Sequence, residues 1–315
     1  MTHAEHSRVS WSDLPDELHR AVASILGSDV ISASNQHHGF SPGSADRVIT
    51  IDGYRAFVKA VHYGRNAYAA ELHRREARVL AALPQSVHAP RLLHFHESDE
   101  WVALVLEDID GGHPGAARDG SDISAVIDAL ASLPTVRGSS LRDLPNAADE
   151  LAGEADGWAQ LRRDNSTNDL PEWVRASFDR LEAAASTVAS AARGDFLVHL
   201  DCRADNVLID PGGTAWIIDW PWASVGARWL DGACYLLDAR RRQESFDADG
   251  VLEAHPLFAG VSDEAINSVL AALAGGFFHK ASQPALPNMP TLRAFQRSEA
   301  IAAADWLHDR WVGAA

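Results

Sequence analysis

The stretch that decides the fold is FLVHLDCRADNVLIDPGGTAWIIDWPWASVG, residues 196–226. Three short apolar runs within it have the composition of β-strands, and the Asp-Pro-Gly-Gly sequence before the last run is typical of a turn; the runs are 196–199, 207–209 and 215–218. Polar residues lie between the runs. Asp201 and Asn206 fall in a loop, and Asp219 directly follows the third run. Two carboxylates and an amide oxygen are hard ligands of the kind that Mg²⁺ prefers.

The order and spacing of these residues match a kinase catalytic loop, in which an Asp precedes an Asn and a later strand ends in a metal-binding Asp. His199-x-Asp201-x4-Asn206, followed by Ile218-Asp219, resembles the aminoglycoside phosphotransferase family, small-molecule kinases related in fold to protein kinases. The resemblance extends from about residue 31 to the C-terminus. The alternative interpretation is a hairpin that carries incidental surface acids.

The resemblance implies an α+β, protein-kinase-like bilobal fold. Residues 1–108 would form a β-rich, nucleotide-binding N-lobe. Residues 109–315 would form a mainly helical lobe that carries catalysis and binds the acceptor.

The composition fits a globular protein with a sizeable core, because 46% of the 315 residues are hydrophobic. No run of 18 apolar residues occurs, and the first ten residues do not have the pattern of a signal peptide. Two cysteines cannot build a disulfide framework. These observations predict a cytoplasmic protein without a membrane partner.

The charge is strongly acidic, with a net value of −17. Residues 1–108 contribute −4 and the remainder −13, so the acidity is concentrated in the C-terminal part. This balance argues against a nucleic-acid partner. It suits a small cationic substrate, and equally an acidic surface that favours solubility.

The N-terminal third alternates between strand and loop patterns. We expect strands near 30–33, 47–51, 54–61, 91–97 and 101–108, with a hairpin turn at Asp52-Gly53. A helix is predicted before them, ending at Leu26. The Gly/Ser/Pro loop at 37–45 could place backbone N–H groups on phosphates, and its candidate residues are Ser41, Gly43 and Ser44. A plain hairpin loop is the alternative.

Lys59 is notable because only two of the 27 basic residues are lysines. It lies inside an apolar strand of a chain that otherwise uses arginine, which indicates a need for a compact point charge. The kinase lysine that contacts the nucleotide phosphates fits that need. An edge-strand lysine with its ammonium in solvent is the alternative.

Glu76 falls in the middle of an apolar stripe on the helix predicted at 65–83. Its neighbours on that stripe are Tyr68, Leu72, Val79 and Leu83. A carboxylate on a buried face is costly unless it is paired. Lys59 is the expected partner, as in kinase-like proteins, and Arg78 is the local alternative.

The second half of the chain has helical periodicity. The strand pattern ends near Asp110-Gly111-Gly112, and the resemblance implies that backbone groups from Glu107 to Ile109 meet the nucleotide base. We expect the helices to span 122–133, 147–162, 171–192, 228–242, 262–281 and 291–311.

The resemblance assigns a role to each residue of the catalytic stretch. Asp201 would orient the acceptor hydroxyl and take its proton, while Asn206 and Asp219 would hold Mg²⁺. His199 would orient the loop. Asp231 matches the family aspartate that hydrogen-bonds the loop backbone, or it caps a helix. Arg203 departs from the family pattern: it could act on the transferred phosphate, or pair with Asp205 or another acid.

The sequence therefore predicts an Mg²⁺-dependent O-phosphotransferase that moves the γ-phosphate of ATP or GTP to a hydroxyl of an antibiotic or amino sugar. Two alternatives remain: a kinase of a metabolite such as choline or a sugar, and an inactive nucleotide-binding module. A protein kinase is disfavoured because no Ala-Pro-Glu segment follows Asp219. Four tryptophans near Asp219 either line the acceptor pocket or pack in the core: Trp216, Trp220, Trp222 and Trp229.

Overall fold

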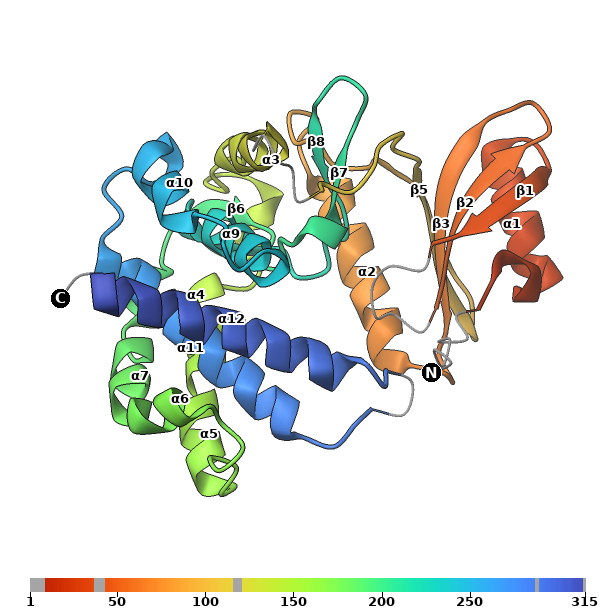
Figure 1. Cartoon of the computed structure of the whole chain (residues 1–315). Helices are drawn as coiled ribbons and strands as arrows, with labels where there is room; N and C mark the ends of the chain where they lie inside the picture. The colour runs from red at the N-terminus through yellow and green to blue at the C-terminus, as the bar shows by residue number, and fades with distance from the viewer. Residues whose placement is uncertain (1–8, 37–42, 116–120, 287–288, 314–315) are drawn as a thin grey trace. The chain divides into compact units, whose positions relative to one another are not determined.

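The structure of the chain is a computed structural model that describes residues 9–36, 43–115, 121–286 and 289–313 (Figure 1). The described residues form two compact units. The first contains the residues up to His113, residues 205–222 and Met289. The second contains the remaining described residues from Pro114 onward. The first unit is rich in strands and the second in helices, which agrees with the predicted α+β class.

A five-stranded antiparallel sheet forms the centre of the first unit. Its strand order is β1-β2-β3-β5-β4, and its strands are β1 Val30–Asn35, β2 Ser44–Thr50, β3 Arg55–His62, β4 Leu92–Glu97 and β5 Trp101–Glu107. The turn at Asp52-Gly53 joins β2 to β3, and Gly53 has a φ of +84° that glycine adopts without a steric penalty. The five strands and the hairpin predicted from the sequence are confirmed.

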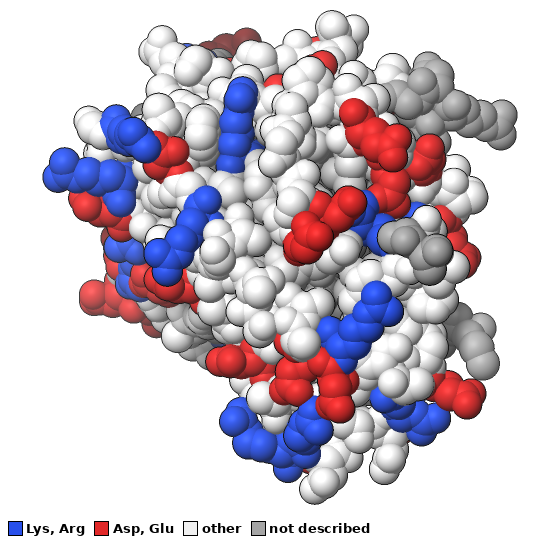
Figure 2. Space-filling view, turned by 90° about the vertical axis from the view of Figure 1, so that its left-hand side faces the viewer, with Lys and Arg blue, Asp and Glu red and all other residues white. Residues whose placement is uncertain are grey.

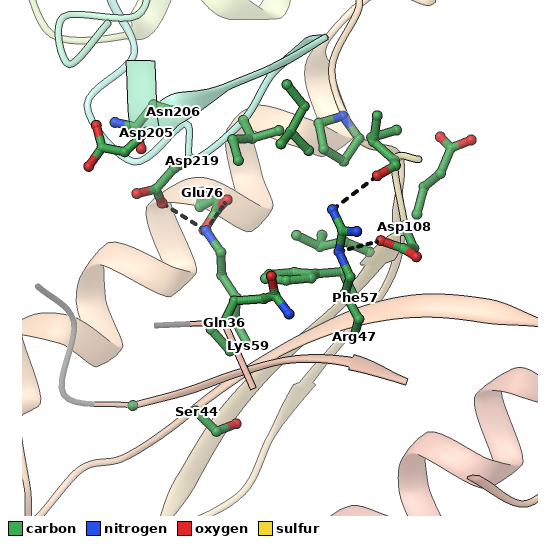
Figure 3. A pocket seen from close by; sticks show the side chains of 18 of the residues that line it. Gln36, Ser44, Arg47, Phe57, Lys59, Glu76, Asp108, Asp205, Asn206 and Asp219 are labelled. Atoms are coloured by element: carbon green, nitrogen blue, oxygen red, sulfur yellow. Dashed lines mark hydrogen bonds and ion pairs between the residues drawn. The ribbon is translucent and has the colours of Figure 1, made fainter. Parts of the chain in front are cut away.

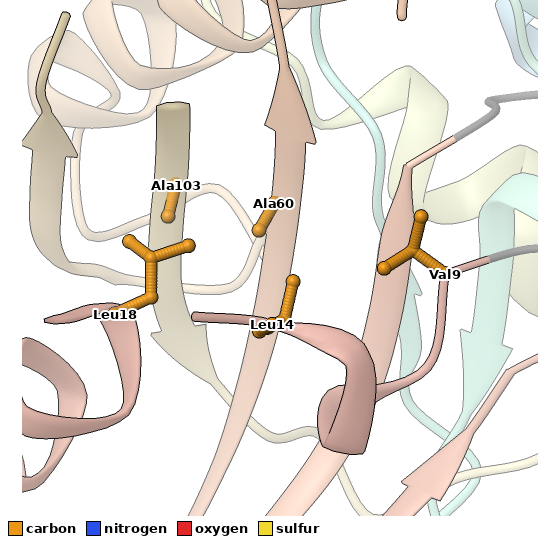
Figure 4. Close-up of a cluster of buried hydrophobic side chains, with 5 residues drawn as sticks. All are labelled: Val9, Leu14, Leu18, Ala60 and Ala103. Atoms are coloured by element: carbon orange, nitrogen blue, oxygen red, sulfur yellow. The ribbon is translucent and has the colours of Figure 1, made fainter. Parts of the chain in front are cut away.

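The two faces of β3 have different partners because successive side chains of a strand point to opposite sides. One face packs against α1 (Asp16–Leu26) and the turn before it. Figure 4 shows one cluster on this face, formed by Val9, Leu14, Leu18, Ala60 and Ala103. Val58 lies on the same face and packs with Val22 of α1. Phe57 and Lys59 alternate with these residues and therefore lie on the other face.

Helix α2 (Ala67–Ala82) packs on β3 and β5 and begins at Asn66, whose side chain accepts a hydrogen bond from the Ala69 N–H at 2.9 Å. The predicted burial of Glu76 is confirmed, since this residue is 2% exposed. The predicted burial of Tyr68 is wrong, since it is 60% exposed. The first turn instead buries two alanines, Ala69 and Ala70, whose small side chains let the helix approach the sheet.

The second unit consists mainly of helices. They are α3 Ser121–Ala131, α4 Ala147–Ala155, α5 Gly157–Arg163, α6 Glu172–Ala176, α7 Phe178–Ala185, α8 Val188–Ala191, α9 Leu230–Arg242, α10 Ala248–Ala254, α11 Asp263–Ser282 and α12 Leu292–Gly313. The sequence predicts most of these regions as helical but misses the short α10.

The single helix predicted at 171–192 is wrong, because this region forms α6, α7 and α8. Ser and Thr residues lie at the breaks, where their hydroxyls bind backbone carbonyls in competition with the helix. Ser186 Oγ donates to Ala183 O at 2.7 Å, and Thr187 Oγ1 donates to Ala184 O at 3.2 Å. The predicted helix at 147–162 is likewise divided, at Asp156.

The break before α5 coincides with very close packing against α11. Trp158 is fully buried and its indole N–H donates to Ala271 O at 2.8 Å. A Cβ added at Gly275 would lie 2.4 Å from Trp158 Nε1, and one at Gly157 would lie 2.4 Å from the Gly275 backbone. Glycines are therefore required where these two helices meet.

The stretch 196–226 forms two short two-stranded sheets. β6 (Phe196–Val198) pairs with β9 (Ser224–Gly226) in the second unit. β7 (Val207–Ile209) and β8 (Ala215–Ile217) form a hairpin in the first unit. The first three strands were predicted, whereas β9 was not.

The surface carries both signs of charge. On the face drawn in Figure 2, acidic and basic side chains lie in small mixed groups separated by uncharged surface. No helix in the described ranges has the length and apolarity needed to cross a membrane.

We predict that Gly275→Ala lowers the free energy of unfolding by about 1–3 kcal/mol, because the added methyl group overlaps the Trp158 indole. Gly153→Ala is the matched control. It lies in α4, and its added methyl group meets no atom within 4 Å, so the change should be neutral or stabilising by up to about 1 kcal/mol. Denaturant unfolding of both variants tests this, and equal stabilities would contradict the packing argument.

Candidate active site

A pocket lies within the first unit (Figure 3). Eight of the predicted site residues line it: Gly43, Ser44, Lys59, Glu76, Glu107, Ile109, Asn206 and Asp219. Ser41, the other residue predicted to bind the nucleotide, lies outside the described residues. The remaining lining residues are Gln36, Ala45, Arg47, Phe57, His73, Pro90, Leu106, Asp108, His113, Asp205, Leu208 and Ile218. The structure thus gathers residues from β2, β3, α2 and the β7–β8 hairpin around one cavity.

Lys59 forms the charged centre of this pocket. Its Nζ donates to Glu76 Oε1 at 2.8 Å, to Glu76 Oε2 at 2.9 Å and to Asp219 Oδ1 at 2.7 Å. The predicted Lys59–Glu76 pair is confirmed, and the alternative partner Arg78 pairs with Glu71 instead. The contact with Asp219 was not predicted.

The two carboxylates stabilise the charge of Lys59 in a partly dry site. The side chain of Lys59 is 15% exposed and that of Glu76 is 3% exposed. Burial alone would lower the pKa of Lys59, but the negative charges of Asp219 and Glu76 outweigh it and raise that pKa above its ordinary value. Burial raises the pKa of Glu76, against the opposing effect of the Lys59 charge. Lys59 therefore stays an ammonium ion.

Asp219 is aimed into the pocket by an unusual backbone conformation. It directly follows the β8 strand and has a φ of +66°. A non-glycine residue in this region costs of order 1 kcal/mol and persists only where other contacts hold it. The ion pair with Lys59 is one such contact.

Oxygen ligands gather beside this cluster. Figure 3 shows Asp205, Asn206 and Asp219 together with Lys59 and Glu76, and we call these five residues the Lys59 end of the pocket. Two carboxylates and an amide suit Mg²⁺, which commonly takes its other ligands from phosphates and water. In the described part of the chain, no group of three or more His, Cys, Asp or Glu residues could hold a metal ion.

The other end of the pocket is built around Arg47, which the sequence analysis did not identify as a site residue. Arg47 Nη2 donates to Ile109 O at 3.3 Å, and its Nε lies 3.2 Å from Asp108 Oδ1. Phe57 lies opposite Arg47 in the β2–β3 register. We call Arg47, Phe57, Glu107, Asp108 and Ile109 the Arg47 end. Leu106, Leu208 and Ile218 add apolar walls to the pocket.

Close approach of the chain at Gly43, directly before β2, to β3 shapes another part of the pocket wall. A Cβ added at Gly43 would lie 2.4 Å from Ala60 O, so only glycine fits there. Ser44 is 2% exposed, and its hydroxyl has no hydrogen-bond partner within the described residues. His73, three residues before Glu76 on α2, also lines the pocket. The i, i+3 spacing to Glu76 could have identified it from the sequence.

In the second unit, Asp231 fixes the loop that carries Asp201. Its carboxylate accepts hydrogen bonds from the His199 N–H at 2.6 Å and the Leu200 N–H at 2.9 Å. Leu200 has a φ of +60°, which these bonds help to hold. Asp231 lies in the first turn of α9 but does not cap that helix. Of the two interpretations drawn from the sequence, the bond to the loop backbone is confirmed.

Arg203 pairs with Asp201, as its Nη1 donates to Asp201 Oδ1 at 2.6 Å. The sequence had left its partner open between Asp205 and another acid. The guanidinium carbons of Arg203 and Arg241 each lie 5.0 Å from the centroid of the Phe295 ring. This ring of α12 therefore holds both cations by cation–π attraction.

A second buried carboxylate of α9, Asp238, also binds the loop. It accepts from the Ala204 N–H at 2.9 Å and pairs with Arg241 at 2.6 Å. Arg241 in turn pairs with Glu299 of α12 at 2.6 Å. Burial raises the pKa of Glu299 to about 7 despite the positive charge of Arg241. The sequence did not identify Asp238, Arg241 or Glu299, because each acts through contacts between distant segments.

Comparison with known proteins agrees with this geometry. Residues 40–265 match the model of the phosphotransferase enzyme family. No curated protein matches the chain.

Several solved structures are similar to the chain. The choline kinase LicA from Streptococcus pneumoniae has a TM-score of 0.58 and 14% identity, covering 92% of this chain and 98% of its own. Spectinomycin phosphotransferase APH(9)-Ia, solved with ADP and spectinomycin, has a TM-score of 0.57, 14% identity and the same coverage of each chain. An aminoglycoside phosphotransferase from Alicyclobacillus acidocaldarius has a TM-score of 0.52 and 15% identity, covering 89% of this chain and 92% of its own. At these identities the likeness establishes a kinase-like fold, as predicted.

We predict that Asp231→Asn destabilises the second unit by about 1–3 kcal/mol, because the new amide N–H₂ must replace an acceptor that faces two backbone N–H groups. Asp156→Asn, a change at the end of α4, is the control and should have little effect. Chemical denaturation measures both. An unchanged stability of Asp231→Asn would show that the loop does not depend on this carboxylate.

A pH dependence follows from Glu299. Its pKa is raised in the folded state, so the folded protein binds more protons than the unfolded protein between about pH 4.5 and 7. We expect Glu299 to reduce the free energy of unfolding as the pH rises through this window, by on the order of 1–3 kcal/mol. Glu299→Gln should remove this contribution, whereas Glu264→Gln, at the exposed start of α11, should not. Identical pH profiles for the two variants would contradict the assignment.

Proposed function

The chain belongs to the phosphotransferase enzyme family, and on that premise we propose that it moves the γ-phosphate of a nucleoside triphosphate to a hydroxyl group of a small molecule. The pocket of the first unit is the proposed nucleotide site. The sequence-based division carries over as part of this proposal: residues 1–108 supply most of the nucleotide site, and residues 109–315 carry catalysis and bind the acceptor. Residues 109–113 and 205–222, which belong to the first unit, add to the nucleotide pocket.

The observation that carries the proposal is the contact of Lys59 with both Glu76 and Asp219 in this pocket. A phosphoryl-transfer site needs a fixed positive charge for the phosphates, and catalysis rests on positioning and charge neutralisation. Glu76 accepts two hydrogen bonds from the ammonium, and Asp219 accepts one on the side where Asn206 and Asp205 are drawn. The apolar walls at the other end suit a planar base.

We assign the metal role to Asn206 and Asp219, whose oxygen atoms lie at the Lys59 end. A bound Mg²⁺ supplies charge neutralisation between the phosphate oxygens. The backbone N–H groups near Gly43 and Ser44 are the proposed phosphate contacts.

Asp201 is the proposed group that orients the acceptor hydroxyl and takes its proton. Its loop is fixed by Asp231 and Asp238, which limits the positions that the carboxylate can reach. The ion pair with Arg203 places a cation beside Asp201. Arg203 would act on the transferred phosphate from there.

For the acceptor we propose an antibiotic, of the aminoglycoside type or another, or an amino sugar. A metabolite such as choline or a sugar is the second candidate, because the similar structures include a choline kinase as well as antibiotic kinases. An inactive nucleotide-binding module is disfavoured because Lys59, Asp201, Asn206 and Asp219 are all present. Release of nucleoside diphosphate in the presence of each acceptor class, with ATP and with GTP, tests the proposal. A protein that binds nucleotide but turns over no hydroxyl compound would favour the inactive module.

We predict that two substitutions separate the proposed roles of the aspartates. Asp219→Asn removes a ligand charge, so Mg²⁺-dependent nucleotide binding should weaken. Asp201→Asn should leave nucleotide affinity near the wild-type value, while transfer falls by about 10²-fold. Calorimetry with a non-hydrolysable nucleotide, together with turnover, measures both. The reverse pattern would falsify the two assignments.

A further inference from the structure

The Arg47 end of the pocket presents hydrogen-bond donors beside residues 107–109, the segment whose backbone the resemblance implies would meet the nucleotide base. Arg47 Nη2 donates to Ile109 O at 3.3 Å, so this carbonyl already accepts a hydrogen bond from the protein. The Glu107 N–H donates to Arg91 O at 2.9 Å. Two backbone groups of this segment are therefore engaged by the protein itself, and the guanidinium of Arg47 lines the cavity beside them, together with the carboxylates of Glu107 and Asp108.

The guanidinium has capacity left for a ligand. Its Nη2 and Nε contact Ile109 and Asp108, while Nη1 makes no hydrogen bond to any residue that the structure describes. The side chain is 28% exposed and lines the pocket. Phe57 lies opposite it in the register, so a planar base in this cavity would lie near an aromatic ring and a planar cation.

A purely structural role does not account for this placement. The side chain of Asp108 is 2% exposed and needs a cation, but Arg55 Nη2 already lies 2.7 Å from its other oxygen, Oδ2. Arg55 does not line the pocket. Arg55 alone could therefore neutralise the charge of Asp108. Arg47 is the arginine that also lines the cavity and brings N–H donors to it.

The two purines present opposite groups to such a donor. Guanine carries two acceptors, O6 and N7, on one edge, and an arginine fork binds them together. Adenine carries an amino donor at the position of O6. That amino group cannot accept from Arg47, so adenine would lose the hydrogen bond that guanine makes through O6 and would place two donors against each other.

We propose that this pocket selects 6-oxopurine nucleotides, guanosine and inosine, over adenosine nucleotides, with Arg47 donating to O6 and N7 of the base. The proposal rests on the proposed function, since it concerns the base of the same nucleotide site. It assigns to Arg47 the choice between ATP and GTP that the sequence leaves open.

Calorimetric titration of the wild-type protein with GDP, IDP and ADP, each with Mg²⁺, is the test. IDP retains O6 and N7 but lacks the 2-amino group of guanine, so it isolates the contact with Arg47. We expect GDP and IDP to bind with similar affinity, and both to bind about tenfold or more tightly than ADP. Since no acceptor is needed, the result does not depend on knowing the substrate.

Three variants identify the residue responsible. Arg47→Met should reduce the preference to about threefold or less by weakening GDP and IDP, and Arg47→Lys, which keeps the charge but loses the fork, should restore only part of it. Arg55→Met removes the other cation beside Asp108 and should retain the full preference. Thermal melting of each variant confirms that it is folded.

The outcomes separate this inference from the function on which it rests. ADP binding as tightly as GDP to the wild-type protein would overturn the base preference alone. Equal loss of preference in Arg47→Met and Arg55→Met would also overturn it, because the effect would then act through Asp108. If none of the three nucleotides bound, the proposed nucleotide site and the base preference would both be wrong.

Discussion

The burial of one ammonium group is the constraint on which the active-site geometry depends. Lys59 lies on the pocket-facing side of β3, where desolvation opposes its charge. A lone buried cation is costly, and two carboxylates from different segments offset that cost. Glu76 comes from α2 and Asp219 from the end of β8. The same ion cluster thus ties the β7–β8 hairpin, which is distant in the chain, to the five-stranded sheet.

The loop that carries Asp201 is held by hydrogen bonds from its backbone N–H groups to buried carboxylates. Two buried carboxylates of α9 accept hydrogen bonds from its backbone: Asp231 binds the start of the loop and Asp238 its end. Between them Arg203 pairs with Asp201 and rests on Phe295 of α12. The side chain proposed to act on the acceptor therefore stands on a backbone that charged groups fix at both ends. Such preorganisation is what phosphoryl transfer requires of a protein.

Sequence patterns predicted the parts of this arrangement that have a local signal. Glu76 was identified because an acid interrupts an apolar stripe, and Asp201, Asn206 and Asp219 because their spacing resembles that of a known family. The second partner of Lys59 could not be predicted in this way, since the contact with Asp219 spans 160 residues. The same reason explains β9, whose three residues form a strand only by pairing with β6. The breaks within 171–192 depend on hydroxyl–carbonyl bonds that helical periodicity does not reveal.

Two residues beside or within the candidate site, Leu200 and Asp219, have a strained backbone conformation with positive φ. Among the described residues, the non-glycine residues with positive φ are Asn165, Leu200 and Asp219. Leu200 precedes Asp201, and its N–H is held by Asp231. Asp219 is held by Lys59. Each strained conformation costs of order 1 kcal/mol or more and persists because a charged group stabilises it. The buried charges thus do more than pair with one another: they hold the backbone in conformations that direct the two proposed catalytic and metal-binding carboxylates.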